Sequence, residues 1–499
     1  MILHVNRKRR LGQRNPMIYG HFIEHFHRQI YGGIYDPGNP LSDEDGLRTD
    51  VLDAMRHIRV PVLRWPGGCF VSSYHWKDAV GEKRTPFFDK AWRVEDPNTF
   101  GTDEYVNMCR KLGCEPYICT NAGTGTAEEM SDWVEYCNLE NEGQYARWRI
   151  ANGYEKPHRV KYWSVGNENY GAWEIGAKSA QEWGRLVAEA SKMIKHVDPE
   201  TELTAAALTD LDWNINLLRM SGQFLDWISI HRYWDDVHEH NDLADYETVM
   251  AFTNHTGDSI RQVRGLLEAM GLEKKIKIAF DEWNLRGWCH PKAHTVSQGV
   301  TKEDYLYPRD LNDDNSKYTM ADAVFSACFL NECNRNCDIV GMANFAPIVN
   351  TRGCIYTYKE GIVLRSTYHV FDLYVNYLGD VILDAWSEGM KSMEARNSAS
   401  GQTETTELID VLATEFSDRE GAALAVVNKH PGEAQEVTLD LEAEGVAVLY
   451  YIAGSSTESY NDVDREEVRI QREDLGVYTP GMKVSVKPHS VGVIQIGVK

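Results

Sequence analysis

Short apolar runs alternate with amphipathic stretches over the first three quarters of the chain. The apolar runs have the composition of buried strands and cover residues 17–22, 60–64, 116–120, 160–165, 203–207, 226–231, 275–280 and 338–344. The amphipathic stretches predict helices over residues 50–58, 102–112, 127–137, 177–196, 211–220, 258–270, 319–334 and 366–378. Repeated alternation of strand and helix predicts a (β/α)8 barrel with long insertions. A doubly wound open sheet is the alternative, although no Gly-rich phosphate loop follows the first strand.

The pattern changes after about residue 380, where the helix signals fade. Alternating β-type runs follow at 421–427, 435–441, 445–452 and 490–496, and they predict an antiparallel, jelly-roll-like β-sandwich. Residues 1–6 also read as a strand that could pair with this sandwich. We therefore expect a catalytic barrel over 16–378 and a sandwich domain built from 1–15 and 379–499. The polar stretch 396–406 is expected to be a surface hairpin or loop.

Composition narrows the class of protein. The chain has 499 residues, of which 42% are hydrophobic and 25% charged, as in ordinary soluble globular proteins. Its net charge of −23 disfavours a nucleic-acid partner, because phosphate binding needs clustered Lys and Arg and the one basic cluster, residues 7–10, is short. The ten cysteines show no paired CxxC framework. Cys333 and Cys337 lie four apart without a matching pair, so we predict no metal site.

The sequence also bears on location. The first ten residues lack the apolar run and small-residue cleavage site of a secretory signal. No later segment approaches the length needed to cross a bilayer. We therefore expect a cytoplasmic protein without a membrane partner.

Two carboxylate-bearing motifs carry the chemistry. Residues 163–168 (WSVGNE) and 278–284 (IAFDEWN) each end a run that reads as a buried strand. Barrel enzymes take their catalytic groups from the C-terminal ends of strands, so Glu168 after the fourth strand and Glu282 after the seventh should share one site. Two such carboxyl groups are what glycoside hydrolysis with retention requires. Surface acids are the alternative, since the chain holds 75 Asp and Glu, but the shared placement favours function.

The second motif contains adjacent acids. In a regular strand Ile278, Phe280 and Glu282 share one face, while Ala279 and Asp281 share the other. We therefore expect only one of Asp281 and Glu282 to point into the mouth of the barrel.

Five motifs in order resemble glycoside hydrolase family 51, the α-L-arabinofuranosidases of clan A. They are residues 20–25 (GHFIEH) with 31–34 (YGGI), 64–70 (RWPGGCF), 166–168 (GNE), 229–233 (SIHRY) and 281–284 (DEWN). The resemblance covers almost the whole chain. It implies that Glu168 is the acid/base and Glu282 the nucleophile, with carboxyl groups about 5 Å apart. For Glu168 to be protonated before attack, its pKa should lie above that of Glu282.

The resemblance also implies residues that bind the sugar. Asn167 would hydrogen-bond the 2-hydroxyl, although it could simply close a turn. Tyr233 would donate to the nucleophile. His231 would line the site, and a satisfied core histidine is an equal alternative.

Three further positions complete this set. Glu24 would accept from sugar hydroxyls, Arg64 would hold the carboxylates, and Trp92 would form an aromatic wall. A buried ion pair serving the fold is the alternative for Arg64, and a core tryptophan is the alternative for Trp92.

Some positions depart from the common family pattern. Cys69 stands where many members have Asn, Pro347 where many have Gln, and Arg286 where many have Trp. Each change removes a contact near the sugar, so the detailed substrate preference is open. His27 replaces a common Gly and with Arg28 could close the floor of the site.

The leading hypothesis is a retaining, exo-acting α-L-arabinofuranosidase that needs no cofactor and releases arabinose from arabinan or arabinoxylan oligosaccharides. A clan relative acting on another sugar, a β-xylosidase or an endo-glucanase, is the second enzyme hypothesis. A sugar-binding protein that kept the barrel is the non-enzymatic one, but both carboxylates are present. The resemblance alone implies a homo-oligomer, a hexamer. The sequence does not define the conformation of the long segment 284–318.

Overall fold

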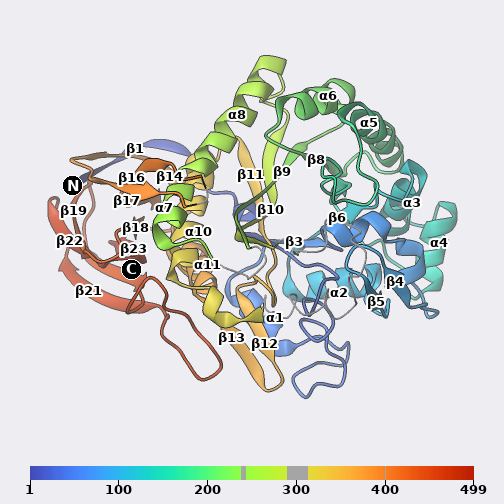
Figure 1. Ribbon diagram of the computed structural model, residues 1–499, viewed down its shortest axis with the longest axis horizontal. Helices are drawn as coiled ribbons and strands as arrows, with labels where there is room; N and C mark the ends of the chain where they lie inside the picture. Colours follow the sequence, from blue (N-terminus) through green and yellow to red (C-terminus); the bar gives the residue numbers. More distant parts are fainter. Residues whose placement is uncertain (238–242, 289–312, 399, 499) are drawn as a thin grey trace.

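The computed structural model describes residues 1–237, 243–288, 313–398 and 400–498. Figure 1 shows a helix-wrapped barrel beside a β-rich unit that holds both chain termini. No helix within these ranges is both long enough and apolar enough to cross a membrane.

Eight parallel strands close into the barrel in the order β10-β11-β2-β3-β6-β7-β8-β9. Their bounds are β2 (Gly20–Phe22), β3 (Val62–Trp65), β6 (Glu115–Thr120), β7 (Tyr162–Val165), β8 (Glu202–Ala207), β9 (Trp227–Val237), β10 (Lys277–Trp288) and β11 (Val340–Phe345). Each strand overlaps one predicted run. The predicted (β/α)8 barrel is therefore confirmed, and the open doubly wound sheet is excluded because this sheet has no free edge.

Eight helices coincide with the predicted ones to within a few residues at each end. They are α1 (Thr49–His57), α2 (Thr102–Leu112), α3 (Ala127–Asn138), α5 (Ala180–Val197), α6 (Leu211–Ser221), α8 (His255–Met270), α10 (Met320–Arg335) and α11 (Ser366–Tyr377). Local capping explains such boundaries. Ser179 precedes α5 as its N-cap, and its side chain forms a capping box with that of Glu182. At the other end of a helix, α2 stops at Gly113, which adopts a left-handed conformation with φ 75°.

Within the described residues two α-helices have no counterpart in the prediction, α4 (Gly143–Ala151) and α7 (Tyr246–Phe252). In α4 only Ala146 and Arg149 are buried, so the segment lacks the apolar stripe that marks a helix in a sequence.

The β-rich unit is a nine-stranded, mostly antiparallel sheet in the order β21-β20-β23-β18-β17-β14-β1-β19-β22. The strands are β1 (Ile2–Gln13), β14 (Val381–Glu388), β17 (Ile409–Glu415), β18 (Ala422–Asn428), β19 (Gln435–Asp440), β20 (Val446–Ile452), β21 (Gln471–Val477), β22 (Met482–Val486) and β23 (Ser490–Ile496). Strand β1 pairs antiparallel with β14 and parallel with β19, so the first strand of the chain lies within this sheet.

Strand β18 shows how this sheet is attached to the barrel. Leu424 and Val426 belong to a core of the sheet's own, whereas Ala423 and Val427 on the other face belong to the main core that also contains residues of α10 and α11. Both faces of the strand are therefore buried, which explains why its sequence is almost continuously apolar.

Three two-stranded hairpins complete the described strands. They are β4 (Phe87–Asp89) with β5 (Val94–Asp96), β12 (Ile355–Tyr358) with β13 (Gly361–Leu364), and β15 (Ser392–Arg396) with β16 (Thr403–Glu407). The last one spans the polar stretch for which a surface hairpin or loop was predicted.

Candidate active site

Glu168 and Glu282 meet at the C-terminal end of the barrel strands. Glu168 follows β7, and Glu282 lies in the middle of β10. One oxygen of each carboxylate lies within 4.8 Å of the other and of a ring nitrogen of His231. Glu168 is 13% and Glu282 10% exposed at the side chain. Retaining glycosidases hold their two carboxyl groups about 5 Å apart, and inverting ones hold them farther apart to admit a water.

The backbone of Glu168 has an unusual conformation. Its φ is 45°, in the left-handed region that non-glycine residues rarely adopt. Gly166, two residues earlier, has φ 69°, and a Cβ there would lie 2.3 Å from the side-chain oxygen of Asn169. The turn after β7 therefore holds the carboxylate in a geometry that costs backbone energy, as is common at functional sites.

The pairing of strand β10 differs from the regular alternation expected for Asp281 and Glu282. Its pairing with β9 is irregular between Ala279 and Glu282, and its pairing with β11 is irregular between Phe280 and Trp283. A regular strand would turn Asp281 and Glu282 to opposite faces, but this irregularity lets both contact His231 and Arg64. The expectation that only one of the two acids points into the barrel mouth was wrong.

Arg64 links the carboxylates as the resemblance implied. Its side chain is fully buried at the end of β3. It donates to Glu282 Oε2 at 2.6 Å and to Asn167 Oδ1 at 2.7 Å, and its Nε lies 3.7 Å from Asp281. A buried arginine in this position balances two carboxylates that would otherwise repel each other.

His231 contacts all three acids. Its Nδ1 lies 2.9 Å from Glu168 and 3.5 Å from Glu282, and its Nε2 lies 3.4 Å from Asp281. Burial lowers the pKa of His231, but the charges of Glu282 and Asp281 and the hydrogen bonds to the acids outweigh burial and raise it to about 10. The imidazole is therefore charged at neutral pH and donates to Glu168.

The charge of His231 also acts on the pKa of Glu168. Burial raises the pKa of Glu168, but the hydrogen bond and charge of His231 and the hydrogen bond from Trp173 outweigh it, so the pKa lies below its ordinary value. The lowered pKa favours the ionised form of Glu168 in the sugar-free protein. The proton that it shares is held on His231.

Asp281 lies deepest in this group. It accepts from the hydroxyls of Tyr117 and Ser229, each at 2.6 Å. Although burial raises the pKa of Asp281, the charge and hydrogen bond of His231, the charge of Arg64 and the Ser229 hydroxyl lower it to about 2. Asp281 thus supplies a fixed negative charge beneath His231.

Two more predicted residues lie beside the nucleophile candidate. The Tyr233 hydroxyl donates to Glu282 Oε1 at 2.7 Å. Asn167 uses its oxygen to accept from Arg64, while its Nδ2 is buried without a hydrogen-bond partner among the described residues. A buried amide without a partner is rare and costly, so this N–H group is free for a ligand.

Glu24 and Trp92 lie on the other side of the site. Glu24 Oε1 accepts from the backbone N–H of Phe70 at 3.1 Å and from the indole of Trp92 at 3.0 Å. Burial, and then the charge of Glu282, raise the pKa of Glu24 to about 8. Gly67 has φ 156°, and a Cβ there would lie 2.4 Å from Glu24 Cγ, so only glycine allows this close approach.

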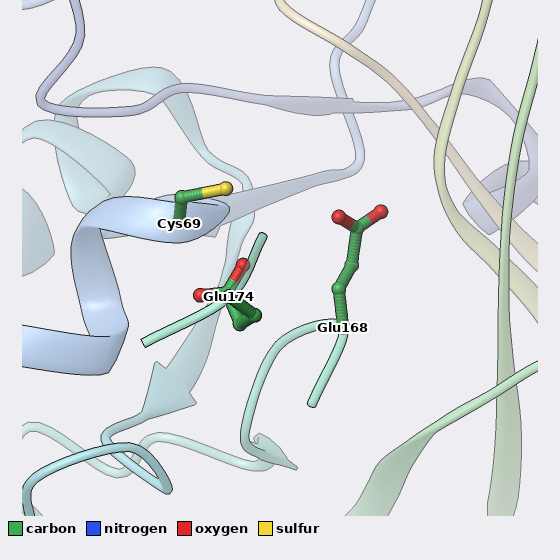
Figure 2. A group of neighbouring side chains, drawn as sticks. All are labelled: Cys69, Glu168 and Glu174. Atoms are coloured by element: carbon green, nitrogen blue, oxygen red, sulfur yellow. The ribbon is translucent and has the colours of Figure 1, made fainter. Parts of the chain in front are cut away.

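Cys69 opens the short helix η2 (Cys69–Ser73) directly after β3. Figure 2 shows its thiol facing the carboxylates of Glu168 and Glu174. Glu174 is 4% exposed and accepts from the Ser72 hydroxyl at 2.5 Å. Burial and the charge of Glu168 raise the pKa of Glu174 to about 8.

The other positions that depart from the family pattern have surroundings unlike those of Cys69. Arg286 is 2% exposed and bound by Asp322 at 2.9 Å and by Asp235, so its charge is used within the fold and not toward a sugar. Pro347 follows a cis peptide bond after β11. His27 and Arg28 both bind Asp313, at 2.9 and 3.3 Å.

The sequence reasoning gave no role to Trp173 and Glu174 and did not foresee that Asp281 reaches the site. Trp173 and Glu174 lie in the loop after β7, a few residues beyond the Gly-Asn-Glu motif that ends at Glu168. Their short distance in sequence from this strand-end motif is the signal that could have marked both residues as site candidates.

Two carboxylates at strand ends of a (β/α)8 barrel, at this separation and with an arginine and a tyrosine on one of them, define the class of retaining barrel glycosidases. The sequence matches the alpha-L-arabinofuranosidase 1 domain over residues 54–251 and the alpha-L-arabinofuranosidase C-terminal domain over residues 281–490. The chain belongs to the α-L-arabinofuranosidases of glycoside hydrolase family 51, and it is a glycoside hydrolase.

Individual relatives match over nearly their full length. The intracellular exo-alpha-(1->5)-L-arabinofuranosidase of Halalkalibacterium halodurans is 33% identical, with 90% of this chain and 89% of the relative covered. The α-L-arabinofuranosidase of Thermotoga maritima, solved as an arabinose complex, is 33% identical with a TM-score of 0.88 over 99% of both chains. The GH51 α-L-arabinofuranosidase of Thermotoga petrophila is also 33% identical, with a TM-score of 0.86 over 100% of both chains.

Proposed function

We propose that this enzyme is an exo-acting α-L-arabinofuranosidase that removes terminal arabinofuranose from arabinan- or arabinoxylan-derived oligosaccharides by double displacement. The observation that carries the proposal is the pair of carboxylate oxygens, on Glu168 and Glu282, within 4.8 Å of each other. This spacing leaves no room for a water between nucleophile and sugar, which favours retention over inversion.

In the first step Glu282 attacks the anomeric carbon while Glu168 passes a proton to the departing glycosidic oxygen. Arg64 and Tyr233 hold the attacking carboxylate in one orientation through bonds of 2.6 and 2.7 Å. The proton that Glu168 delivers is drawn from His231, which donates to Glu168 at 2.9 Å and is charged before the sugar binds.

In the second step Glu168 acts as the base. Formation of the covalent arabinosyl ester neutralises Glu282, so the negative charge around His231 falls. Glu168 then takes a proton from water, and the hydroxide character of that water breaks the ester.

The sugar itself is proposed to contact Glu24, Asn167, Trp92 and Cys69. Glu24 has a raised pKa of about 8, so its carboxyl group is protonated at neutral pH and can donate to a sugar hydroxyl as well as accept from one. The free Nδ2 of Asn167 suits the 2-hydroxyl, whose hydrogen bond strengthens as positive charge develops on the ring.

The remaining parts of the proposal rest on relatives and sequence. We assign the catalytic unit to residues 16–378 and the supporting sheet to 1–15 and 379–499. The name of the Halalkalibacterium halodurans relative, an intracellular exo-acting enzyme on α-(1->5) links, favours a cytoplasmic enzyme that degrades short oligosaccharides from hemicellulose. A homo-oligomer, a hexamer, remains a proposal from family resemblance.

Azide rescue tests the roles of the two acids. Glu168→Ala should lose most hydrolysis of natural arabinosides, and azide should restore turnover of an aryl arabinofuranoside to an arabinosyl azide of retained configuration. Glu282→Ala should give no retained azide product. Normal hydrolysis by either variant contradicts the assignment, and faster turnover of aryl xylosides or soluble glucans than of aryl arabinofuranosides contradicts the substrate class.

A further inference from the structure

Cys69, Glu168 and Glu174 form a group of possible metal ligands that the proposed mechanism does not use as such. One ligand atom from each residue, a sulfur and two carboxylate oxygens, lies within 4.8 Å of the other two. The three side chains come from two segments, η2 after β3 and the loop after β7, and Figure 2 shows them facing one another. Zinc is bound by thiolate at about 2.3 Å and by carboxylate oxygen at about 2.0–2.2 Å, so small side-chain rotations would bring these atoms to a common ion.

A second observation concerns Glu174 alone. Its Oε1 accepts from Ser72, but its Oε2 is buried without a hydrogen-bond partner among the described residues. Figure 2 shows this carboxyl group beside the Cys69 residue, with the Glu168 carboxylate across from both. A buried carboxylate oxygen without a partner is costly, so the group is poised to bind a ligand that enters between the three side chains.

Access and charge also favour a cation at this place. Cys69 is partly exposed, unlike most of the described cysteines. Among the described residues Glu174 forms no ion pair, whereas Glu168 is paired with His231 at 2.9 Å.

A neighbouring group of ligand atoms is less suitable. Glu168, His231 and Glu282 also lie within 4.8 Å of one another. However, Arg64 is bonded to Glu282 at 2.6 Å, and His231 Nδ1 is engaged by Glu168 at 2.9 Å. The positive charges of Arg64 and His231 repel a cation on that side of Glu168.

We propose that Cys69, Glu168 and Glu174 bind a thiophilic divalent cation of the Zn²⁺ or Cd²⁺ class, and that this cation inhibits the enzyme. As the metal binds, the thiol proton of Cys69 and the carboxyl proton of Glu174 are released to the solvent, and no electron is transferred. The inhibition rests on the proposed role of Glu168, because the bound carboxylate can no longer move a proton. Binding itself does not depend on that role.

Binding is tested with Cd²⁺ alone, by the ultraviolet charge-transfer band of a cadmium–thiolate bond. The band should form in the wild type and in Cys337→Ser, the matched control at the other partly exposed described cysteine. It should be absent in Cys69→Ser and require about tenfold or more Cd²⁺ in Glu174→Gln, a loss of roughly 1.4 kcal/mol or more. A band that persists in Cys69→Ser overturns the proposal, whether or not the enzyme hydrolyses arabinosides.

Inhibition is tested with Zn²⁺ on an aryl arabinofuranoside, each variant being compared with its own metal-free rate. The concentration for half inhibition should rise about tenfold or more in Cys69→Ser and Glu174→Gln and stay unchanged in Cys337→Ser, and Mg²⁺ should not inhibit. An equal Zn²⁺ concentration for half inhibition in Cys69→Ser and the wild type would mean that the ion binds elsewhere, and would contradict the proposal. Circular dichroism of each variant confirms that it is folded.

Discussion

Replacing His231 by asparagine is expected to move the acidic limb of kcat toward higher pH. His231 is the main group that holds the pKa of Glu168 below its ordinary value, through a hydrogen bond of 2.9 Å and a positive charge. Asparagine removes the charge and retains a similar volume. Burial, which raises the pKa of Glu168, then acts with much less opposition.

The magnitude follows from the geometry. With the two charge centres about 4 Å apart and an effective dielectric constant of about 20, their interaction is worth about 4 kcal/mol, or roughly 3 pKa units. Asparagine can still donate a neutral hydrogen bond and recover part of this, so we expect a rise of about 1–3 units in the pKa of Glu168.

The assay is kcat against pH on an aryl arabinofuranoside with a good leaving group. Hydrolysis of the covalent intermediate is then rate-limiting and requires Glu168 in its ionised form. At the acidic pH of this limb His231 has regained a proton from the solvent, so the limb reports the pKa of Glu168 beside a charged His231. A burst of released phenol confirms the rate-limiting step. His255→Asn is the matched control, because His255 bonds Glu404 at 3.0 Å between α8 and the β15–β16 hairpin, away from the site.

The refuting result is a slower enzyme with an unmoved acidic limb. It would mean that His231 only supports the barrel, as a satisfied core histidine, and does not set the protonation of Glu168. A limb that moves equally in His255→Asn would show that the effect is not specific to the site.

Three further outcomes are expected. Arg64→Met should lower the free energy of unfolding by about 3–5 kcal/mol, measured by urea denaturation, because buried Glu282 and Asp281 lose their arginine; unchanged stability contradicts the network described. Asn167→Ala should reduce kcat/KM for arabinosides by about 10²-fold and lose less on a 2-deoxy substrate, while an equal loss on both substrates contradicts a contact with the 2-hydroxyl. Because the folded pKa of Glu174 is raised to about 8 from 4.5, its contribution to stability is present below pH 4.5 and is lost as the pH rises to 8. Glu174→Gln should therefore flatten the fall in stability between pH 4.5 and 8 by up to about 5 kcal/mol, measured as Tm against pH, and a slope equal to that of the wild type contradicts the raised pKa.

The sequence predicted the barrel strands and the acids at their C-terminal ends correctly, because both predictions depend on short-range patterns. Each barrel strand is an apolar run with a turn or helix signal after it, and Glu168 and Glu282 follow such runs directly. In a closed parallel barrel all such ends meet at one face, so the period of hydrophobic residues was enough to bring the two acids together.

The failures came where residues distant in sequence act on one another. Regular alternation assigned Asp281 and Glu282 to opposite faces, but the irregular pairing of β10 with both neighbouring strands turns both acids inward. The effect of His231 on the pKa of Glu168 was not visible for a similar reason, since no local pattern shows that His231, 63 positions away, contacts Glu168.

The amino-acid sequence by itself determined the eightfold barrel, the β-rich C-terminal part and the two candidate carboxylates, because periodicity and strand-end position are properties of short segments. Only the tertiary structure decided the charge on Glu168, the sharing of His231 among three acids and the meeting of Cys69 with Glu174. These depend on distances of a few ångströms between side chains from different strands and loops, and electrostatic energies at such distances are set by burial and by neighbours, not by the order of residues along the chain.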